Sequence, residues 1–245
     1  MTSMNQTSQL AFYDFDGTLT SGNVVRRYAF FARHQPSKIR SALKFSKLLL
    51  SIPVWLALEF RSRRLFNEIF FREYRGMEQD RLREQGQRLF DEEILPTLYP
   101  GSKELLEKDR REGYLPVLVT GELDVALEHV IRYFGFHAVI SNRLVFEKGI
   151  ATGEVRPPLV AETEKVRAME RLCRQYGAEM KKSKAYSDSF SDVPMLEAVG
   201  ISTAVNPDRR LRRVATERGW AILDLKRGTY VNRRREDTPG RVSGV

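Results

Sequence analysis

Residues 10–20 read L-A-F-Y-D-F-D-G-T-L-T, an apolar and aromatic run that ends in two aspartates and a glycine. Such a run is typical of a buried strand in a parallel sheet, and Gly17 indicates a tight turn directly after it. Because residues two apart in an extended segment point to the same side, the carboxylates of Asp14 and Asp16 can reach one small volume. Two acids that close repel each other unless a cation lies between them, and Mg²⁺ prefers hard oxygen ligands of this kind. The alternative is that Asp14 caps a turn and Asp16 is solvated.

Composition bounds the class of protein. The chain has 245 residues, of which 42% are hydrophobic, enough for one large domain or for a domain with an insert. A formal net charge of +9 favours anionic partners, namely phosphorylated metabolites, acidic lipid surfaces or nucleic acid. The single cysteine excludes an internal disulfide and a cysteine-based zinc site. The polar first nine residues contain no apolar signal region, so we expect a cytoplasmic location. Peripheral contact with the inner face of the membrane is compatible with this location.

A helical block over about residues 23–94 is expected after the first strand, with breaks at Pro36, Pro53 and Gly76. The block is both apolar and basic. Its apolar run Leu48–Leu58 is shorter than the about 20 residues that span a bilayer, and it contains a proline. The run either packs inside a helical subdomain, which we favour, or lies in a membrane interface with the flanking basic residues at headgroup level.

From Leu95 onward, apolar strands alternate with helical segments. This alternation predicts a doubly wound parallel sheet, that is, a Rossmann-like α/β core with the all-helical block inserted after its first strand. The predicted catalytic core comprises residues 1–22 and 95–228, and the predicted cap comprises residues 23–94. The charged segment 229–245, which contains glycine and proline, is expected to be a flexible tail.

Polar residues stand at the predicted carboxyl ends of several strands, where ligands bind in sheets of this kind. Thr120 and Gly121 follow one strand, and Asp188 follows another. Asp188 would complete a cation cage that Asp14 and Asp16 leave open. The Thr120 hydroxyl and loop N–H groups are suited to phosphate oxygens, and Lys165 supplies a positive charge. Together these residues predict a phosphate and metal site.

Four segments in this order resemble the motifs of the haloacid dehalogenase superfamily. They are D-F-D-G-T-L-T at 14–20, V-T-G at 119–121, E-K-V-R at 164–167 and S-D-S-F-S-D-V-P-M-L at 187–196. The similarity is greatest to the phosphoserine-phosphatase-like branch, in which a helical cap is inserted directly after the first motif. The resemblance implies a phosphatase that uses Mg²⁺ and forms an aspartyl-phosphate.

The resemblance also implies a role for each matching residue. Asp14 would be the nucleophile and Asp16 the general acid and base. The implied magnesium ligands are Asp14, the Asp16 main-chain carbonyl and Asp188. The implied phosphate-binding residues are Thr120, Gly121 and Lys165, and the supporting residues around them are Asp192, Thr18 and Ser191. For substrate specificity we single out three cap residues, Asn23, Arg26 and Arg27.

The substrate remains open between two classes. One is a small phosphorylated metabolite such as phosphoserine or histidinol phosphate, and the other is a lipid phosphate monoester presented at an anionic membrane. In phosphoserine phosphatases the position of Asn23 is usually a glutamate that binds the substrate ammonium, and Asn23 cannot form that ion pair. The alternative function is a catalytically inactive basic module that binds anionic membrane or nucleic acid. For the enzyme, no nucleic-acid partner is expected.

Overall fold

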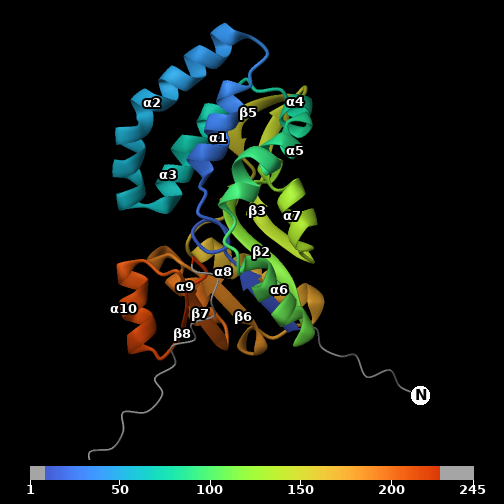
Figure 1. Ribbon diagram of the computed structural model, residues 1–245, viewed down its shortest axis with the longest axis vertical. Coiled ribbons are helices and arrows are strands. Elements are labelled where there is room, and N and C mark those ends of the chain that lie inside the picture. The colour runs from blue at the N-terminus through green and yellow to red at the C-terminus, as the bar shows by residue number, and fades with distance from the viewer. Residues whose placement is uncertain (1–8, 227–245) are drawn as a thin grey trace, which may run out of the picture.

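The structure is a computed structural model that describes residues 9–226, and of residues 56–61 and 63 it describes the backbone alone (Figure 1). A sheet with helices on both faces forms the lower half of the molecule in Figure 1, and a helical block with a small hairpin forms the upper half. The predicted flexible tail, residues 229–245, lies outside the described residues.

Six parallel strands form the main sheet in the order β3-β2-β1-β6-β7-β8. The strands are β1 (Gln9–Tyr13), β2 (Tyr114–Leu123), β3 (Ala138–Asn142), β6 (Lys184–Ser187), β7 (Ile201–Val205) and β8 (Ala221–Leu223). From β1 the chain first builds one edge through β2 and β3, and it later builds the other edge through β6, β7 and β8. The direction reverses between β1 and β6, where a sheet of this kind opens a crevice for ligands. The predicted Rossmann-like core is confirmed.

Both faces of β1 are buried. Leu10 and Phe12 belong to one apolar cluster, and Ala11 and Tyr13 belong to another. This two-sided burial explains why the strand reads as a continuous apolar run, because helices cover both faces of a parallel sheet. The helices α6 (Ser102–Arg111) and α7 (Glu128–Phe134) contribute to the cluster of Tyr13, and the helices α8 (Thr163–Tyr176), α9 (Val193–Ala198) and α10 (Arg209–Glu217) contribute to the cluster of Phe12.

The helical block follows β1 and contains α1 (Val24–Arg33), α2 (Lys38–Arg61), α3 (Arg63–Phe70), the short 3-10 helix η1 (Phe71–Tyr74), α4 (Gln79–Glu84) and α5 (Gly86–Leu89). The predicted break at Pro53 is wrong, because α2 continues through this residue. Proline removes one N–H donor from a helix, yet its fixed φ is compatible with helical backbone. Leu48 and Trp55 are buried on either side of Pro53, and this packing holds the helix together across the missing hydrogen bond.

The apolar run of α2 faces two environments. Leu48 and Trp55 are buried, and the Trp55 ring lies edge-on to that of Phe70, with centroids 4.9 Å apart. Leu50 and Val54 are instead exposed. The prediction that the apolar run packs inside the helical block therefore holds for only one side of α2. Among the helices of residues 9–226, none combines the length and the apolar character that crossing a bilayer requires.

The hairpin of β4 (Leu144–Glu147) and β5 (Ile150–Val155) extends from the α/β part of the chain to the helical block. The Gly76 N–H donates to the Ala151 carbonyl at 2.9 Å, and the Ala151 N–H donates to the Met77 carbonyl at 2.8 Å. The hairpin thus shares backbone hydrogen bonds with the segment after η1. The division of the chain into a core and a cap at residues 22 and 95 stays a prediction. The hairpin comes after residue 95 in the sequence, yet it is hydrogen-bonded to the helical block.

Candidate active site

The two aspartates of the opening motif lie at the carboxyl end of β1. Asp14 is buried directly after the strand, and Asp16 lies in a tight turn in which the Thr20 N–H donates to the Phe15 carbonyl at 3.2 Å. Gly17 adopts a φ of +81°, which glycine tolerates better than other residues. The turn brings both aspartates to one cavity of about 210 Å³ at the crevice of the sheet.

Lys165 holds the carboxylate of Asp14. Its Nζ lies 2.8 Å from Asp14 Oδ1 and 2.8 Å from Asp192 Oδ2, and the Ser187 hydroxyl donates to the same Asp192 oxygen at 2.8 Å. The lysine comes from the first turns of α8 and is buried. Burial by itself lowers the pKa of Lys165, but the two carboxylates outweigh this effect and raise it. Lys165 therefore stays charged and orients Asp14.

Asp188, which follows β6, lies beside the loop of the two aspartates. The Thr18 Oγ1 atom is 3.1 Å from Asp188 Oδ1 and 3.4 Å from Asp14 Oδ2, so one hydroxyl contacts both carboxylates. A Cβ atom at Gly17 would lie 2.0 Å from Asp188 Oδ2, so only glycine lets this carboxylate approach. The nearby Asp192 adds a further negative charge behind Lys165.

Negative charge dominates the cavity. Its charged lining residues are the acids Asp14, Asp16, Glu122, Glu162, Asp188 and Asp192 and the base Lys165. Burial raises the pKa of Asp14 to about 6, and Lys165 opposes this rise. Burial, together with Asp14 and Asp192, raises the pKa of Asp188 well above its usual value. One lysine does not balance these acids, so the site would be stabilised by a further cation.

The oxygen donors of the site are of the kind that Mg²⁺ prefers. Within residues 9–226, however, no group of three acidic, histidine or cysteine side chains is arranged so that it could hold a metal ion by itself. The expected ligands are the Asp14 and Asp188 carboxylates, linked by Thr18, and the main-chain carbonyl of Asp16. Magnesium is commonly held by one or two carboxylates, with waters and substrate phosphate completing the octahedron. A sparse set of oxygen donors is therefore what this ion needs.

Thr120 and Gly121 stand at the end of the neighbouring strand β2 and line the cavity. The Thr120 hydroxyl oxygen accepts the Glu122 N–H at 3.1 Å, and this contact leaves the hydroxyl proton available to a ligand oxygen. The Gly121 carbonyl accepts from the Asn142 side-chain amide at 2.8 Å, which fixes the turn. The predicted phosphate-binding pair thus lines the same cavity as the two aspartates of the opening motif.

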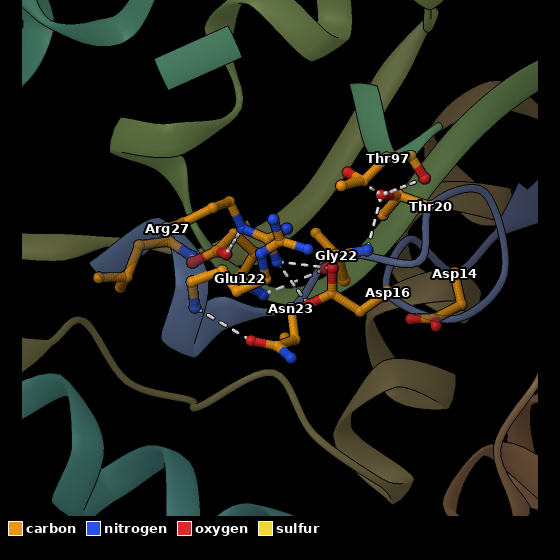
Figure 2. A network of polar contacts seen from close by, with 12 residues as sticks. Asp14, Asp16, Thr20, Gly22, Asn23, Arg27, Thr97 and Glu122 are labelled. Carbon is orange, nitrogen blue, oxygen red and sulfur yellow. Dashed lines mark hydrogen bonds and ion pairs between the residues drawn. The ribbon is translucent and has the colours of Figure 1, made fainter. Parts of the chain in front are cut away.

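Arg27 of α1 lies between two carboxylates (Figure 2). Its Nη2 atom is 2.6 Å and 2.5 Å from the two oxygens of Asp16, and its Nε atom donates to Glu122. Only 2% of Arg27 is exposed, and it is not among the residues that line the cavity. In this structure Arg27 thus contacts Asp16 from outside the cavity lining, and its role in substrate specificity stays a prediction.

The other two predicted specificity residues of the cap also lie outside the cavity lining. Asn23 caps the N-terminus of α1, where its side chain accepts the Arg26 N–H at 3.0 Å (Figure 2). Arg26 is exposed, with one guanidinium nitrogen 3.6 Å from Glu93. Ser191 does line the cavity, and its hydroxyl is 2.9 Å from that of Ser189.

Two residues of the helical block line the cavity instead, and sequence reasoning missed both. They are Val24 of α1 and Asn67 of α3. Asn67 is only 2% exposed, and its amide nitrogen has no hydrogen-bond partner among the described residues. Nothing in the local pattern F-N-E distinguishes this asparagine from an ordinary polar residue of an amphipathic helix. Its position becomes evident only in the folded protein, where the Asn67 amide lies near Gly121 of β2.

Comparison with known proteins identifies the class. The model of the haloacid dehalogenase-like hydrolase family matches residues 11–197. Phosphoserine phosphatase SerB1 of Mycobacterium tuberculosis is 30% identical over 224 residues, which are 88% of this chain and 70% of that protein. The chain therefore belongs to the haloacid dehalogenase-like hydrolase family, and within it the chain is a phosphatase similar to the phosphoserine phosphatases.

Two solved structures share the fold. A protein of unknown function from Bordetella pertussis Tohama I has a TM-score of 0.75 at 24% identity, covering 90% of this chain and all of that one. A structure described as a phospho-aspartyl intermediate analogue of phosphoserine phosphatase has a TM-score of 0.64 at 18% identity, covering 90% of this chain and 94% of that one. The predicted resemblance to the phosphoserine-phosphatase-like branch is confirmed.

Proposed function

We propose that the protein hydrolyses a phosphomonoester with Mg²⁺ and through an aspartyl-phosphate on Asp14. The observation that best supports this proposal is the contact between Lys165 and one oxygen of Asp14, at 2.8 Å. This contact orients the carboxylate and leaves its second oxygen facing Thr18 and Asp188. A nucleophile held in this way differs from a carboxylate that only caps a turn. The phospho-aspartyl analogue with the same fold is consistent with this chemistry.

The proposed reaction has two steps. In the first, an oxygen of Asp14 attacks phosphorus, the bond from phosphorus to the alcohol oxygen breaks, and Asp16 gives that oxygen a proton. In the second, Asp16 takes a proton from water, the water oxygen attacks phosphorus, and the bond to Asp14 breaks to release inorganic phosphate. Thr120, Gly121 and Lys165 hold the phosphoryl oxygens in both steps.

In this proposal the other residues of the site hold the metal ion or orient the reacting groups. Bound Mg²⁺ would be held by Asp14, the Asp16 carbonyl and Asp188, and it would screen the repulsion between the phosphate and the nucleophile. Asp192 orients Lys165 through its 2.8 Å contact. Thr18 orients the carboxylates of Asp14 and Asp188, and Ser191 contributes a hydroxyl at the edge of the cavity.

Hydrolysis of an aryl phosphate is the direct test. We expect phosphate release that requires Mg²⁺, stops when the metal is chelated, and falls by at least about a thousandfold in Asp14→Asn. The exposed cap variant Gln87→Leu is the control and should retain wild-type activity. Equal activity in Asp14→Asn and wild type would overturn the covalent proposal. Inactivity of the wild type towards every phosphomonoester would favour the alternative, an inactive basic module.

The substrate class is narrowed by the side chains around the cavity. SerB1 is named a phosphoserine phosphatase, but here Asn23 caps a helix and the only cation of the described lining, Lys165, is bound to Asp14 and Asp192. A substrate carboxylate would find no free positive partner among these lining residues. Within the two open classes we therefore favour a phosphomonoester whose alcohol carries no carboxylate, whether a small metabolite or a lipid.

A lipid substrate is favoured by one surface, the exposed apolar side of α2. Its members are Ile39, Leu43, Leu50 and Val54, whose spacing of four, seven and four residues places them on one side of a helix. Between residues 38 and 58 the sequence has four basic residues and no acidic one. The helix lies at the outer edge of the helical block (Figure 1). We propose that this surface rests on an anionic membrane.

Co-sedimentation with vesicles tests the membrane proposal. Binding should occur with vesicles that contain phosphatidylglycerol, weaken with salt, and be several-fold weaker with purely zwitterionic vesicles. Leu50→Glu should reduce binding, whereas Ile201→Glu, on an exposed apolar residue of β7 in the α/β core, should not. Equal binding of the two variants, or no binding by the wild type, would contradict the role of α2.

A further inference from the structure

Asn67 is a buried polar side chain that the reaction described above does not use. It belongs to α3 of the helical block and lines the cavity together with the two aspartates of the opening motif. Its amide nitrogen is buried and lacks a hydrogen-bond partner among the described residues. An amide N–H₂ group buried without an acceptor destabilises the folded protein, because it has lost its hydrogen bonds to water and gained none in return. A ligand oxygen in the cavity would remove that cost.

The surroundings of Asn67 place this amide at the wall of the cavity near the phosphate-binding turn. Its nitrogen lies 3.1 Å from the position that a Cβ atom on Gly121 would occupy, so the helical block closes directly on this turn. The other residue that the helical block contributes to the lining is Val24, which is apolar. The helical block thus contributes one apolar side chain and one neutral hydrogen-bond donor to the lining of the cavity.

No cation of the described cavity lining remains for a second anionic group of the substrate. Among the described lining residues Lys165 is the only cation, and it is held by Asp14 and Asp192. Arg27 is held by Asp16 and Glu122. The carboxylate of Glu162, which also lines the cavity, would repel a negatively charged group. A neutral oxygen therefore satisfies Asn67, whereas a carboxylate meets repulsion.

We propose that Asn67 is a specificity residue whose amide donates a hydrogen bond to an uncharged oxygen on the alcohol part of the phosphomonoester. The substrate class is a glycerol-type phosphate with a hydroxyl or ester oxygen close to the phosphate. The inference rests on the proposed phosphatase reaction, and it adds which phosphomonoesters this active site accepts.

Three alkyl phosphates of similar size test the proposal by kcat/KM. They are glycerol 3-phosphate, n-propyl phosphate, which lacks both hydroxyls, and 3-phosphoglycerate, which has a carboxylate in place of the terminal hydroxymethyl group. In wild type, the kcat/KM for glycerol 3-phosphate should be about three- to tenfold higher than that for n-propyl phosphate, as expected for one neutral hydrogen bond. The kcat/KM for glycerol 3-phosphate should exceed that for 3-phosphoglycerate by a larger factor. Equal values for the three substrates would overturn the proposal.

The variant Asn67→Leu separates recognition of the alcohol from recognition of the phosphate. It should remove the preference for glycerol 3-phosphate over n-propyl phosphate and leave inhibition by inorganic phosphate within about twofold of wild type. The control Gln87→Leu removes an exposed amide of the same helical block and should leave the preference intact. Weaker inhibition by phosphate, with all substrates reduced equally, would assign Asn67 to the phosphoryl group and overturn the proposal.

Failure of this inference differs from failure of the proposed reaction. Hydrolysis that depends on Asp14 but shows no preference for an alcohol oxygen would reject the role of Asn67 alone. The melting temperature of Asn67→Leu checks that the variant is folded. If it is not, Asn67→Ser, which is shorter but still polar, should reduce the preference for glycerol 3-phosphate without abolishing folding, and an unchanged preference would count against the proposal.

Discussion

At the scale of single residues, the site contains more buried negative charge than its own lysine balances. Asp14 and Asp188 are linked by one hydroxyl, and burial raises the pKa of both. A buried carboxylate whose pKa is raised destabilises the folded protein at any pH where it must be ionised. The bare site thus has an electrostatic cost that a bound cation offsets.

This cost predicts that Mg²⁺ stabilises the protein in a pH-dependent way. The pKa of Asp14 is about 6 when folded and about 3.8 when unfolded, so the metal-free protein loses stability as pH rises from about 4 to 6, and the raised pKa of Asp188 adds to this loss. Protons compete with the metal below this range. At a hundredfold excess over Kd, Mg²⁺ should add roughly 3 kcal/mol, or several degrees in Tm, at pH 7.5 and clearly less at pH 5.

Thermal melts with and without MgCl₂ at the two pH values give this measurement. Asp188→Asn should abolish most of the increase at pH 7.5, since it removes one expected ligand and one negative charge. An increase in Tm of equal size at pH 5 and 7.5, or one that persists in Asp188→Asn, would show that Mg²⁺ binds elsewhere.

Single residues also show where the sequence is insufficient. That one cavity is lined by Asp14, Asp16, Thr120, Lys165 and Asp188 could be predicted, because each stands in a motif at the end of a strand or the start of a helix, and the topology brings such ends together. Arg27 could not be placed, because its partner Glu122 is 95 residues away and the pair forms only when α1 packs beside β2. Asn67 gave no local signal at all.

At the scale of elements, α2 is notable for a proline, Pro53, in its interior. A helical proline leaves the carbonyl four residues earlier without its usual donor and costs about 3 kcal/mol relative to alanine. The proline itself is exposed, so little packing depends on its ring. The sequence pattern led to a predicted break here, since local propensity does not include the burial of Leu48 and Trp55.

Replacement of this proline should therefore stabilise the protein. Pro53→Ala restores one helical hydrogen bond and should raise the free energy of unfolding by about 1–3 kcal/mol. Chemical denaturation measures the change, and Ser46→Ala, at another exposed position of α2, is the control with an expected change below about 0.5 kcal/mol. A loss of stability in Pro53→Ala would mean that a bend at this position is required for packing.

At the scale of the whole molecule, one cluster of buried apolar side chains extends from the sheet into the helical block. This cluster includes Tyr13 of β1 and Tyr28 and Phe70 of the helical block. The alternation of strands and helices was enough to predict the sheet, because each βα unit is a local pattern. The contact of the β4–β5 hairpin with the helical block could not be predicted, because it joins backbone groups about 75 residues apart that have no sequence signature.

The central claim is that Asp14 becomes phosphorylated during turnover. Rapid acid quench of the enzyme with a ³²P-labelled aryl phosphate and Mg²⁺, followed by peptide mapping, tests it most directly. We predict label on the peptide that contains Asp14, sensitive to hydroxylamine and absent in Asp14→Asn. Turnover with no label on that peptide, or label that persists in Asp14→Asn, would contradict the account.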